Sequence, residues 1–250
     1  MSVSWPANTI INYEFLGELK IMTHAKIANA LEGIKWPFAM ICIVLLPPAT
    51  LQLFHQITPL LHSLTFKSYF MYGFFGFFVI LSVFSHFMFN LFMPFEHEFS
   101  HGIFVTLTFN KVTALKVFEE GGKIEYQGTS NWLILLAPYF FPTVALFVAI
   151  GTGFLDPKWK SWGQFWLGVS IAYQLFSTLV ETELRQPDLI RSGIPFSVMT
   201  LPFLNVLSYS LLTAYLTGGL RAIGLTFKEI LISPVNPCYL VAKWVFFHAH

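Results

Sequence analysis

Charged residues are scarce in this sequence: Asp, Glu, Lys and Arg make up only 11% of its 250 residues. A soluble domain of this size carries about 25% charged residues, most of them on its surface. Hydrophobic residues account for 55% of the chain, and its mean hydropathy is +0.64. The composition therefore excludes an ordinary soluble domain and predicts a protein whose outer surface faces lipid.

Low net charge, few cysteines and few aspartates further limit the functions that this chain can have. A net charge of +1 gives the chain no basic face for binding nucleic acid. The two cysteines, Cys42 and Cys238, lack the spacing of a metal or redox motif. The chain has only two aspartates, Asp156 and Asp188, so few aspartate ligands are available to a metal ion.

Long apolar runs indicate how the chain is organised. A bilayer core of about 30 Å is crossed by roughly 20 apolar residues in a helix. Runs of at least this length cover residues 37–61, 69–93, 131–153, 162–184 and 194–217. We therefore expect an all-α, multi-pass integral membrane protein with about five to six transmembrane helices. The predicted divisions are a polar N-terminal segment (1–36), a membrane-embedded core (37–217) and an interfacial C-terminal segment (218–250).

Residues 103–129 differ from the apolar runs on either side. β-Branched and polar residues alternate in this segment, and Gly121-Gly122 provides a turn. The pattern predicts one or two β-hairpins. Unpaired strand edges are not tolerated in lipid, so these strands must lie at the membrane interface or against protein.

The sequence His97-Glu98-Phe99-Ser100-His101 is an HExxH motif. On a helix, residues four apart share a face, so both imidazoles can reach one metal ion. The glutamate of this motif is not a ligand but acts as general base on a zinc-bound water. The motif therefore predicts that His97 and His101 bind Zn²⁺ and that Glu98 is catalytic.

A catalytic zinc ion needs a third protein ligand. If each apolar run crosses the membrane once, Asp188 lies on the same side as the HExxH motif and Asp156 on the opposite side. Asp188 is therefore the predicted third ligand. Glu181 and Glu183 share its side and remain alternatives, although interfacial charges are the simpler interpretation of both.

The order of these features resembles the site-2 protease family of intramembrane zinc metalloproteases. The resemblance consists of HExxH at the end of an apolar span, a strand-like segment GGKIEYQG, an apolar span and a distant aspartate, and it covers about residues 75–210. Asp188 stands in Gln-Pro-Asp-Leu, whereas the family's usual aspartate precedes a glycine, so the resemblance is to a divergent, bacterial-type branch. No PDZ-like insertion is present, so substrate filtering by such a domain is not expected.

The resemblance implies a zinc endopeptidase of the bacterial inner membrane that cleaves membrane-spanning substrates. It assigns His97, His101 and Asp188 as zinc ligands and Glu98 as the catalytic base. The expected partners are the lipid bilayer and a protein substrate with a transmembrane helix; the sequence leaves the oligomeric state open. One alternative is a non-catalytic pseudoprotease or scaffold that binds client helices, which an intact HExxH disfavours. A transporter is a weaker alternative, because the sequence has no internal repeat.

Overall fold

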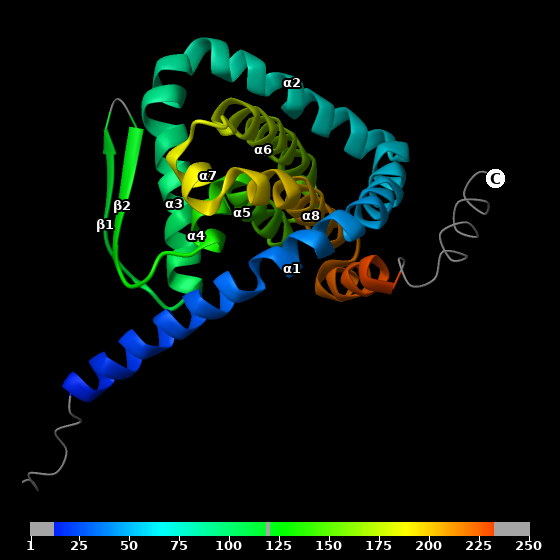
Figure 1. Ribbon diagram of the computed structural model, residues 1–250. Coiled ribbons are helices and arrows are strands. Elements are labelled where there is room, and N and C mark those ends of the chain that lie inside the picture. The colour runs from blue at the N-terminus through cyan, green and yellow to red at the C-terminus, as the bar shows by residue number, and fades with distance from the viewer. Residues whose placement is uncertain (1–12, 119–120, 233–250) are drawn as a thin grey trace, which may run out of the picture.

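The computed structural model describes residues 13–118 and 121–232 of the chain. Residues 1–12 of the predicted polar segment and 233–250 of the predicted interfacial segment lie outside this part. The elements are shown in Figure 1 and follow in chain order: α1 (Tyr13–His62), α2 (Leu64–Phe87), η1 (Met88–Phe92), α3 (Met93–Leu107), β1 (Lys111–Phe118), β2 (Gly121–Gln127), α4 (Trp132–Leu136), η2 (Ala137–Tyr139), α5 (Thr143–Gly153), η3 (Pro157–Trp159), α6 (Lys160–Glu181), α7 (Pro187–Ser192) and α8 (Ile194–Ile232).

Within the described residues, three helical stretches are long and apolar enough to cross a membrane: His24–His62, Lys67–Leu107 and Ile194–Ile232. A fourth crossing results if the bent pair Trp132–Tyr139 and Thr143–Gly153 is one broken span. With the two-stranded sheet, these helices confirm the predicted fold, a multi-pass helical membrane protein with a small β-hairpin. Helix α6 forms where the fourth apolar run was predicted, but it is not among the stretches that meet this test.

Only one of the two predicted ends of the membrane-embedded core (37–217) coincides with a break in the structure. Helix α8 breaks at Gly218 and Gly219, directly after the predicted core end, and Gly219 has a φ of 65° that glycine adopts without strain. The predicted start at residue 37 lies inside the continuous helix α1. The three-part division of the chain stays a prediction.

The predicted span 131–153 is broken rather than straight. Helices α4 and α5 are bent by 71° across the break. Pro138 and Pro142 lie in or next to the break. Proline lacks the N–H that a helix interior requires and its ring clashes with the preceding turn, which favours a break at this position.

The predicted hairpin starts later than residue 103, because α3 continues to Leu107. Phe104 and Val105 are buried on α3, and the ring of Phe104 packs edge-on against Phe140 and Phe141. This burial favours helix over the β-propensity of the local sequence. Strands β1 and β2 then form one antiparallel hairpin.

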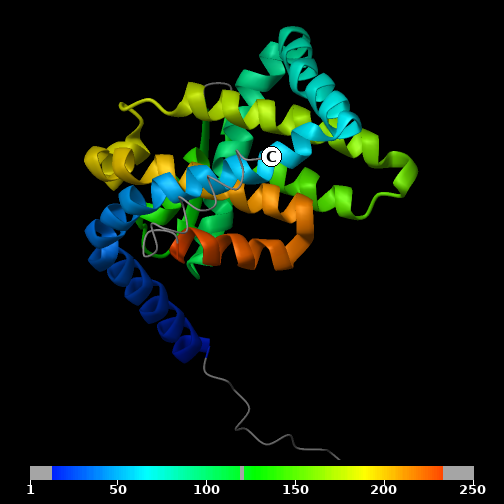
Figure 2. The same ribbon diagram turned by 90° about the vertical axis from the view of Figure 1, so that its right-hand side faces the viewer.

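Helices α2 and α6 are in close contact. A Cβ atom at Gly73 would lie 1.8 Å from the carbonyl oxygen of Phe165, and one at Gly168 would lie 2.0 Å from that of Phe70. Glycines at helix contacts allow this approach. Figures 1 and 2 show α8 beside α1, with the hairpin along α3 and α7 leading into α8.

Candidate metal centre and active-site cavity

The HExxH motif lies on α3, and α7 brings an aspartate against it. The rings of His97 and His101 have centroids 4.9 Å apart, one helical turn along the same face. The Nε2 atoms of His101 and His97 lie 3.2 Å and 3.6 Å from Oδ2 of Asp188. One ligand atom from each of the three residues lies within 4.8 Å of the others. The structure therefore brings together the three residues predicted as ligands.

The other nitrogen of each imidazole has a partner of its own. Nδ1 of His101 donates a hydrogen bond to the carbonyl oxygen of Ile134 at 2.7 Å. Nδ1 of His97 donates to Oε2 of Glu181 at 3.2 Å. In a neutral imidazole a proton on Nδ1 leaves a lone pair on Nε2. When both imidazoles are neutral, as metal binding requires, both Nε2 lone pairs face the Asp188 carboxylate. When His101 is protonated, its Nε2 donates a hydrogen bond to Oδ2 of Asp188 at 3.2 Å.

This donor set fits a zinc ion. Two imidazole nitrogens and one carboxylate oxygen are the ligand types of a catalytic zinc site, in which a fourth position stays open for water. Hydrogen bonds from the remote ring nitrogen to a carbonyl or carboxylate fix the orientation of metal-binding histidines. Both kinds of partner are present in this structure, at Ile134 and Glu181.

Asp188 stays ionised in this setting. Burial alone would raise the pKa of its carboxyl, but hydrogen bonds and charge interactions with His101 and His97 outweigh this and hold the pKa below its usual range. The side chain is 21% exposed, so it lies at the edge of the buried pair. An ionised oxygen beside two imidazoles is the form that binds a divalent cation.

Glu98 lies beside this group, underneath strand β2. Its carboxylate is largely buried and accepts a hydrogen bond from the backbone N–H of Ile124. A Cβ atom at Gly122 would lie only 2.4 Å from Cγ of Glu98. A side chain at position 122 would thus displace either the strand or the glutamate, so glycine is required for β2 to cover this part of α3.

A cavity of about 640 Å³ opens over the cluster. Its walls come from α3, from β2 and from the segment that carries α7, and His97, Glu98, His101 and Asp188 all line it. The volume lies within the range typical of ligand sites. Two cationic side chains, Lys123 and Arg191, also reach its wall.

A second carboxylate of the same helix is buried behind the cluster. Glu96 is 2% exposed and accepts a hydrogen bond from Ser100 at 3.0 Å. Ser100 is in turn hydrogen-bonded to Thr143 of α5, and the Tyr173 hydroxyl of α6 lies 3.5 Å from Glu96. These contacts connect α3 to α5 and α6, and they fix the depth of the HExxH turn in the bundle.

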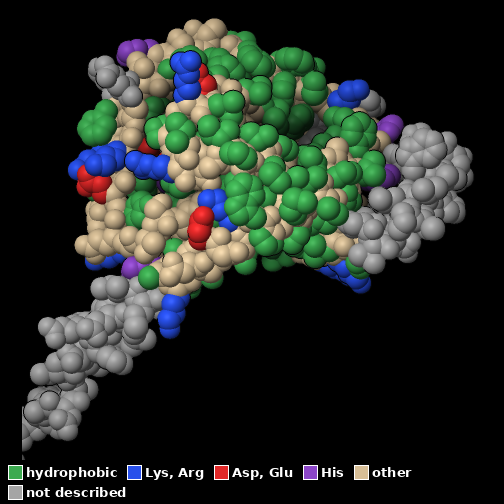
Figure 3. Space-filling model, in the orientation of Figure 1, with side chains coloured by type: hydrophobic (Ala, Val, Ile, Leu, Met, Phe, Trp, Pro, Cys, Tyr) green, Lys and Arg blue, Asp and Glu red, His purple; other side chains and the backbone are tan. Residues whose placement is uncertain are grey.

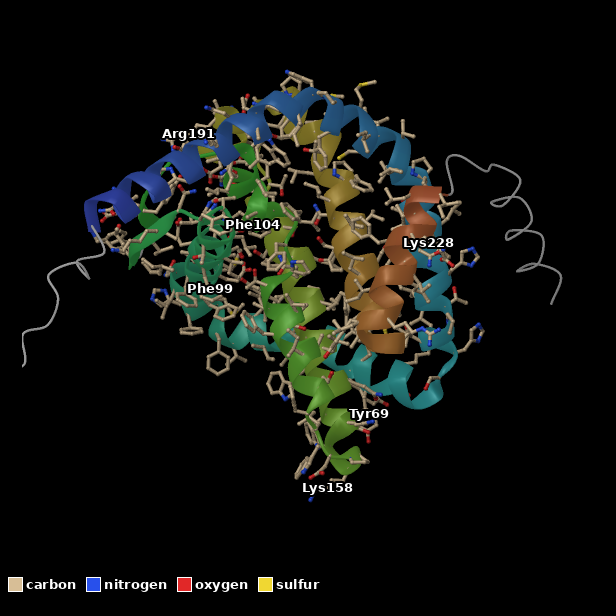
Figure 4. All side chains as sticks on the ribbon, turned by 90° about the horizontal axis from the view of Figure 1, so that it is seen from below. Tyr69, Phe99, Phe104, Lys158, Arg191 and Lys228 are labelled. Carbon is tan, nitrogen blue, oxygen red and sulfur yellow. The ribbon has the colours of Figure 1, made fainter. Side chains whose placement is uncertain are left out.

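The other carboxylates considered as a third metal ligand do not belong to the group of three ligands. Asp156 is exposed beside η3 and is not part of the metal-binding group. Lys158, two residues on, lies at the opposite end of the molecule from Arg191 of α7 (Figure 4). Glu183 is exposed after α6, whereas Glu181 contacts His97. From the sequence, Glu181 was an alternative ligand because it was predicted on the same side of the membrane as the HExxH motif. The hydrogen bond from His101 to the carbonyl oxygen of Ile134 was not predicted.

The fold and the site together define a helical membrane protein with one cavity that contains four converging side chains. Two histidines and a glutamate come from the HExxH motif, and the aspartate comes from α7. A family model described as Peptidase M50B-like matches residues 70–217. The chain therefore belongs to the Peptidase M50B-like family, and the resemblance to site-2 proteases is confirmed. No curated protein and no solved structure gives a significant match to the chain. Family membership supports a protease function.

Proposed function

We propose that this protein is an intramembrane zinc metalloprotease that hydrolyses peptide bonds of membrane-spanning substrates. The observation that supports this most strongly is the convergence of His97, His101 and Asp188, with Glu98 lining the same cavity. Apolar helices around the cavity and membership of a peptidase family support the membrane setting and the type of reaction. We further propose the bacterial inner membrane as its location.

The chemistry divides between the metal and the protein. Zinc, when held by His97, His101 and Asp188, supplies Lewis-acid chemistry: it polarises a peptide carbonyl and makes hydroxide available near neutral pH. Glu98 accepts the proton of the attacking water and delivers it to the leaving amine. The hydrogen bond from the backbone N–H of Ile124 in β2 holds the Glu98 carboxylate at the cavity wall.

Strand β2 is suited to present the substrate. Among the described residues β2 pairs only with β1, so its second edge has no strand partner. Residues Gly121–Ile124 of β2 line the cavity that contains the cluster. An extended peptide that adds to this edge would hydrogen-bond through its main chain and run past Glu98. Pairing of this kind would hold an unwound segment of a substrate helix in an extended, cleavable form.

The test uses the full chain reconstituted in lipid vesicles with synthetic single-span transmembrane helices as substrates. We expect the wild-type protein to cleave at least one helix within or near its apolar stretch, detected by mass spectrometry of the products. Glu98→Gln should retain zinc and the fold but lose cleavage, because glutamine cannot accept the proton.

Two outcomes would contradict the proposal. Equal cleavage by Glu98→Gln and the wild type would exclude Glu98 as the base. Zinc-loaded wild-type protein that binds the helices but cleaves none of them would favour the non-catalytic scaffold.

A further inference from the structure

A second cavity lies between α1, α2, α6 and α8, away from the candidate metal centre. It has a volume of about 300 Å³ and is lined almost entirely by apolar side chains, among them Ile57, Leu167, Leu175 and Leu212. Figure 3 shows a hollow in this part of the molecule, surrounded by hydrophobic side chains. The hydroxyl of Tyr209, also in the lining, is buried with no hydrogen-bond partner in the described part of the chain.

A more polar cavity of about 700 Å³ adjoins it. The two share Leu60, Leu167 and Leu216 in their walls. The polar cavity is formed where α1 and α5 end, α6 begins and α8 breaks, and these ends gather on the right-hand side of Figure 2. Lys160 and Gln164 line it, and Oε1 of Gln164 has no partner among the described residues.

The residues around this polar cavity are those of a membrane–water interface. Trp159, directly before α6, and Trp162 and Trp166 on its first turns are each about half exposed. Tryptophans of this kind form the belts found at headgroup level. The segments 59–67, 152–164 and 217–221 carry the cations Lys67, Lys158, Lys160 and Arg221 against a single carboxylate, Asp156. This end of the bundle is therefore positively charged.

We propose that the joined cavities bind one phospholipid with an anionic headgroup. An acyl chain fills the apolar cavity, and the headgroup lies in the polar cavity. Its phosphate lies near the Lys160 ammonium and the amide N–H2 of Gln164, and a donor group of the headgroup faces Oε1 of Gln164. The apolar cavity is too small for a substrate helix. One turn of a helix about 10 Å wide already occupies more than the 300 Å³ of this cavity. A flexible hydrocarbon chain fits such a space, and the positive charge selects an anionic headgroup.

The site is separate from the candidate active site. Lys158 at this end and Arg191 beside the metal-centre cavity lie at opposite ends of the molecule (Figure 4). The proposal therefore does not depend on the protease function.

The test measures lipid retention by the full chain. Protein is taken from nanodiscs of either dioleoyl phosphatidylglycerol or dioleoyl phosphatidylcholine, exchanged into mild detergent, and examined by native mass spectrometry. We expect one phosphatidylglycerol per chain to be retained and phosphatidylcholine to be retained less. Lys160→Gln should lower the preference for phosphatidylglycerol about fivefold, the effect of one cation at an anionic surface. Lys158→Gln should lower this preference less than Lys160→Gln, because Lys158 adds to the charge of this end but does not line the polar cavity.

Three tryptophan variants test the apolar cavity. Leu175→Trp places a large ring in the apolar cavity and should abolish retention of both lipids. Leu179→Trp lies one turn further along α6, is 81% exposed, and should retain lipid like the wild type. Ile57→Trp fills the same cavity from α1, so misfolding of one variant leaves the other as a test.

Three results would overturn the proposal. Wild-type protein that retains no phospholipid has no such site. Equal retention by Leu175→Trp, Ile57→Trp and Leu179→Trp would place the lipid outside the cavity. Retention of phosphatidylcholine equal to that of phosphatidylglycerol would remove the role of the cations.

Discussion

Each histidine of the candidate metal centre is oriented through the ring nitrogen that faces away from Asp188. His101 donates to a backbone carbonyl, whereas His97 donates to the side chain of Glu181. A carbonyl partner cannot be removed by mutation, but a carboxylate can. Glu181 is therefore the residue at which orientation of a ligand can be tested without touching the ligand.

Replacing Glu181 with alanine should weaken zinc binding about 10- to 100-fold, because His97 loses the partner that fixes its ring and tautomer. Glu181→Gln keeps an acceptor oxygen and should lose less. The measurement is competition for zinc against a chelator of known affinity.

Glu183→Ala provides the control, since Glu183 is exposed two residues further along the chain. An unchanged zinc affinity in Glu181→Ala would contradict the role assigned to Glu181.

Gly122→Ala should separate metal binding from catalysis. Its new methyl group would meet Cγ of Glu98 and the carbonyl oxygen of Pro94. A displaced general base loses rate on the order of 100-fold, while His97 and His101 keep their zinc. Cleavage rate and zinc content measured on the same sample distinguish the two effects.

Gly151→Ala is the matched control, because a Cβ at this helical position has nothing within 4 Å. Full activity of Gly122→Ala would show that β2 does not fix Glu98.

At the scale of the elements, the short helix α4 places the carbonyl oxygen of Ile134 next to His101. Helix α4 has only five residues, and its first turn depends on Asn131, whose side chain accepts hydrogen bonds from the N–H groups of Leu133 and Ile134 at 3.1 Å. A helix this short has little stability of its own. The cap therefore contributes directly to the position of the Ile134 carbonyl.

Asn131→Ala should destabilise the protein by about 1 kcal/mol through loss of this cap, which corresponds to a melting temperature about 2–4 °C lower for a chain of this size. Asn131→Ser keeps an acceptor oxygen and should recover most of the difference. Thermal unfolding of the metal-free proteins in one detergent measures both. Identical melting temperatures for Asn131→Ala and the wild type would contradict the capping role.

The positions of helices and strands were predicted from the sequence more accurately than the positions at which helices bend or end. Five apolar runs and one hairpin were located, because length, hydropathy and strand propensity are local properties. The bend after α4 was not predicted, although Pro138 and Pro142 signal it, since hydropathy is continuous across residues 131–153. The extension of α3 to Leu107 could not be predicted from local propensity, because it depends on the distant rings that bury Phe104.

At the scale of the whole molecule, the arrangement of helices brings Asp188 to a motif about 90 residues earlier. Counting each apolar run as one crossing favoured Asp188 over Asp156, and the structure places Asp188 with the two histidines. Helix α6, one of the crossings counted, is not among the described stretches that meet the span test, so membrane side alone does not separate the two aspartates. Membrane side could not show that Glu181 contacts His97, because it does not fix the direction in which a side chain points. It also could not reveal the paired cavities at the opposite end, which exist only once four helices are packed.

The most direct test of the central claim is the zinc content per chain of three purified proteins: the wild type, Asp188→Ala and Asp156→Ala. We expect about one zinc ion per chain in the wild type and in Asp156→Ala, and loss of most of it in Asp188→Ala, because two imidazoles alone do not form a complete site. Zinc retained in Asp188→Ala, or absent from the wild type, would contradict the account.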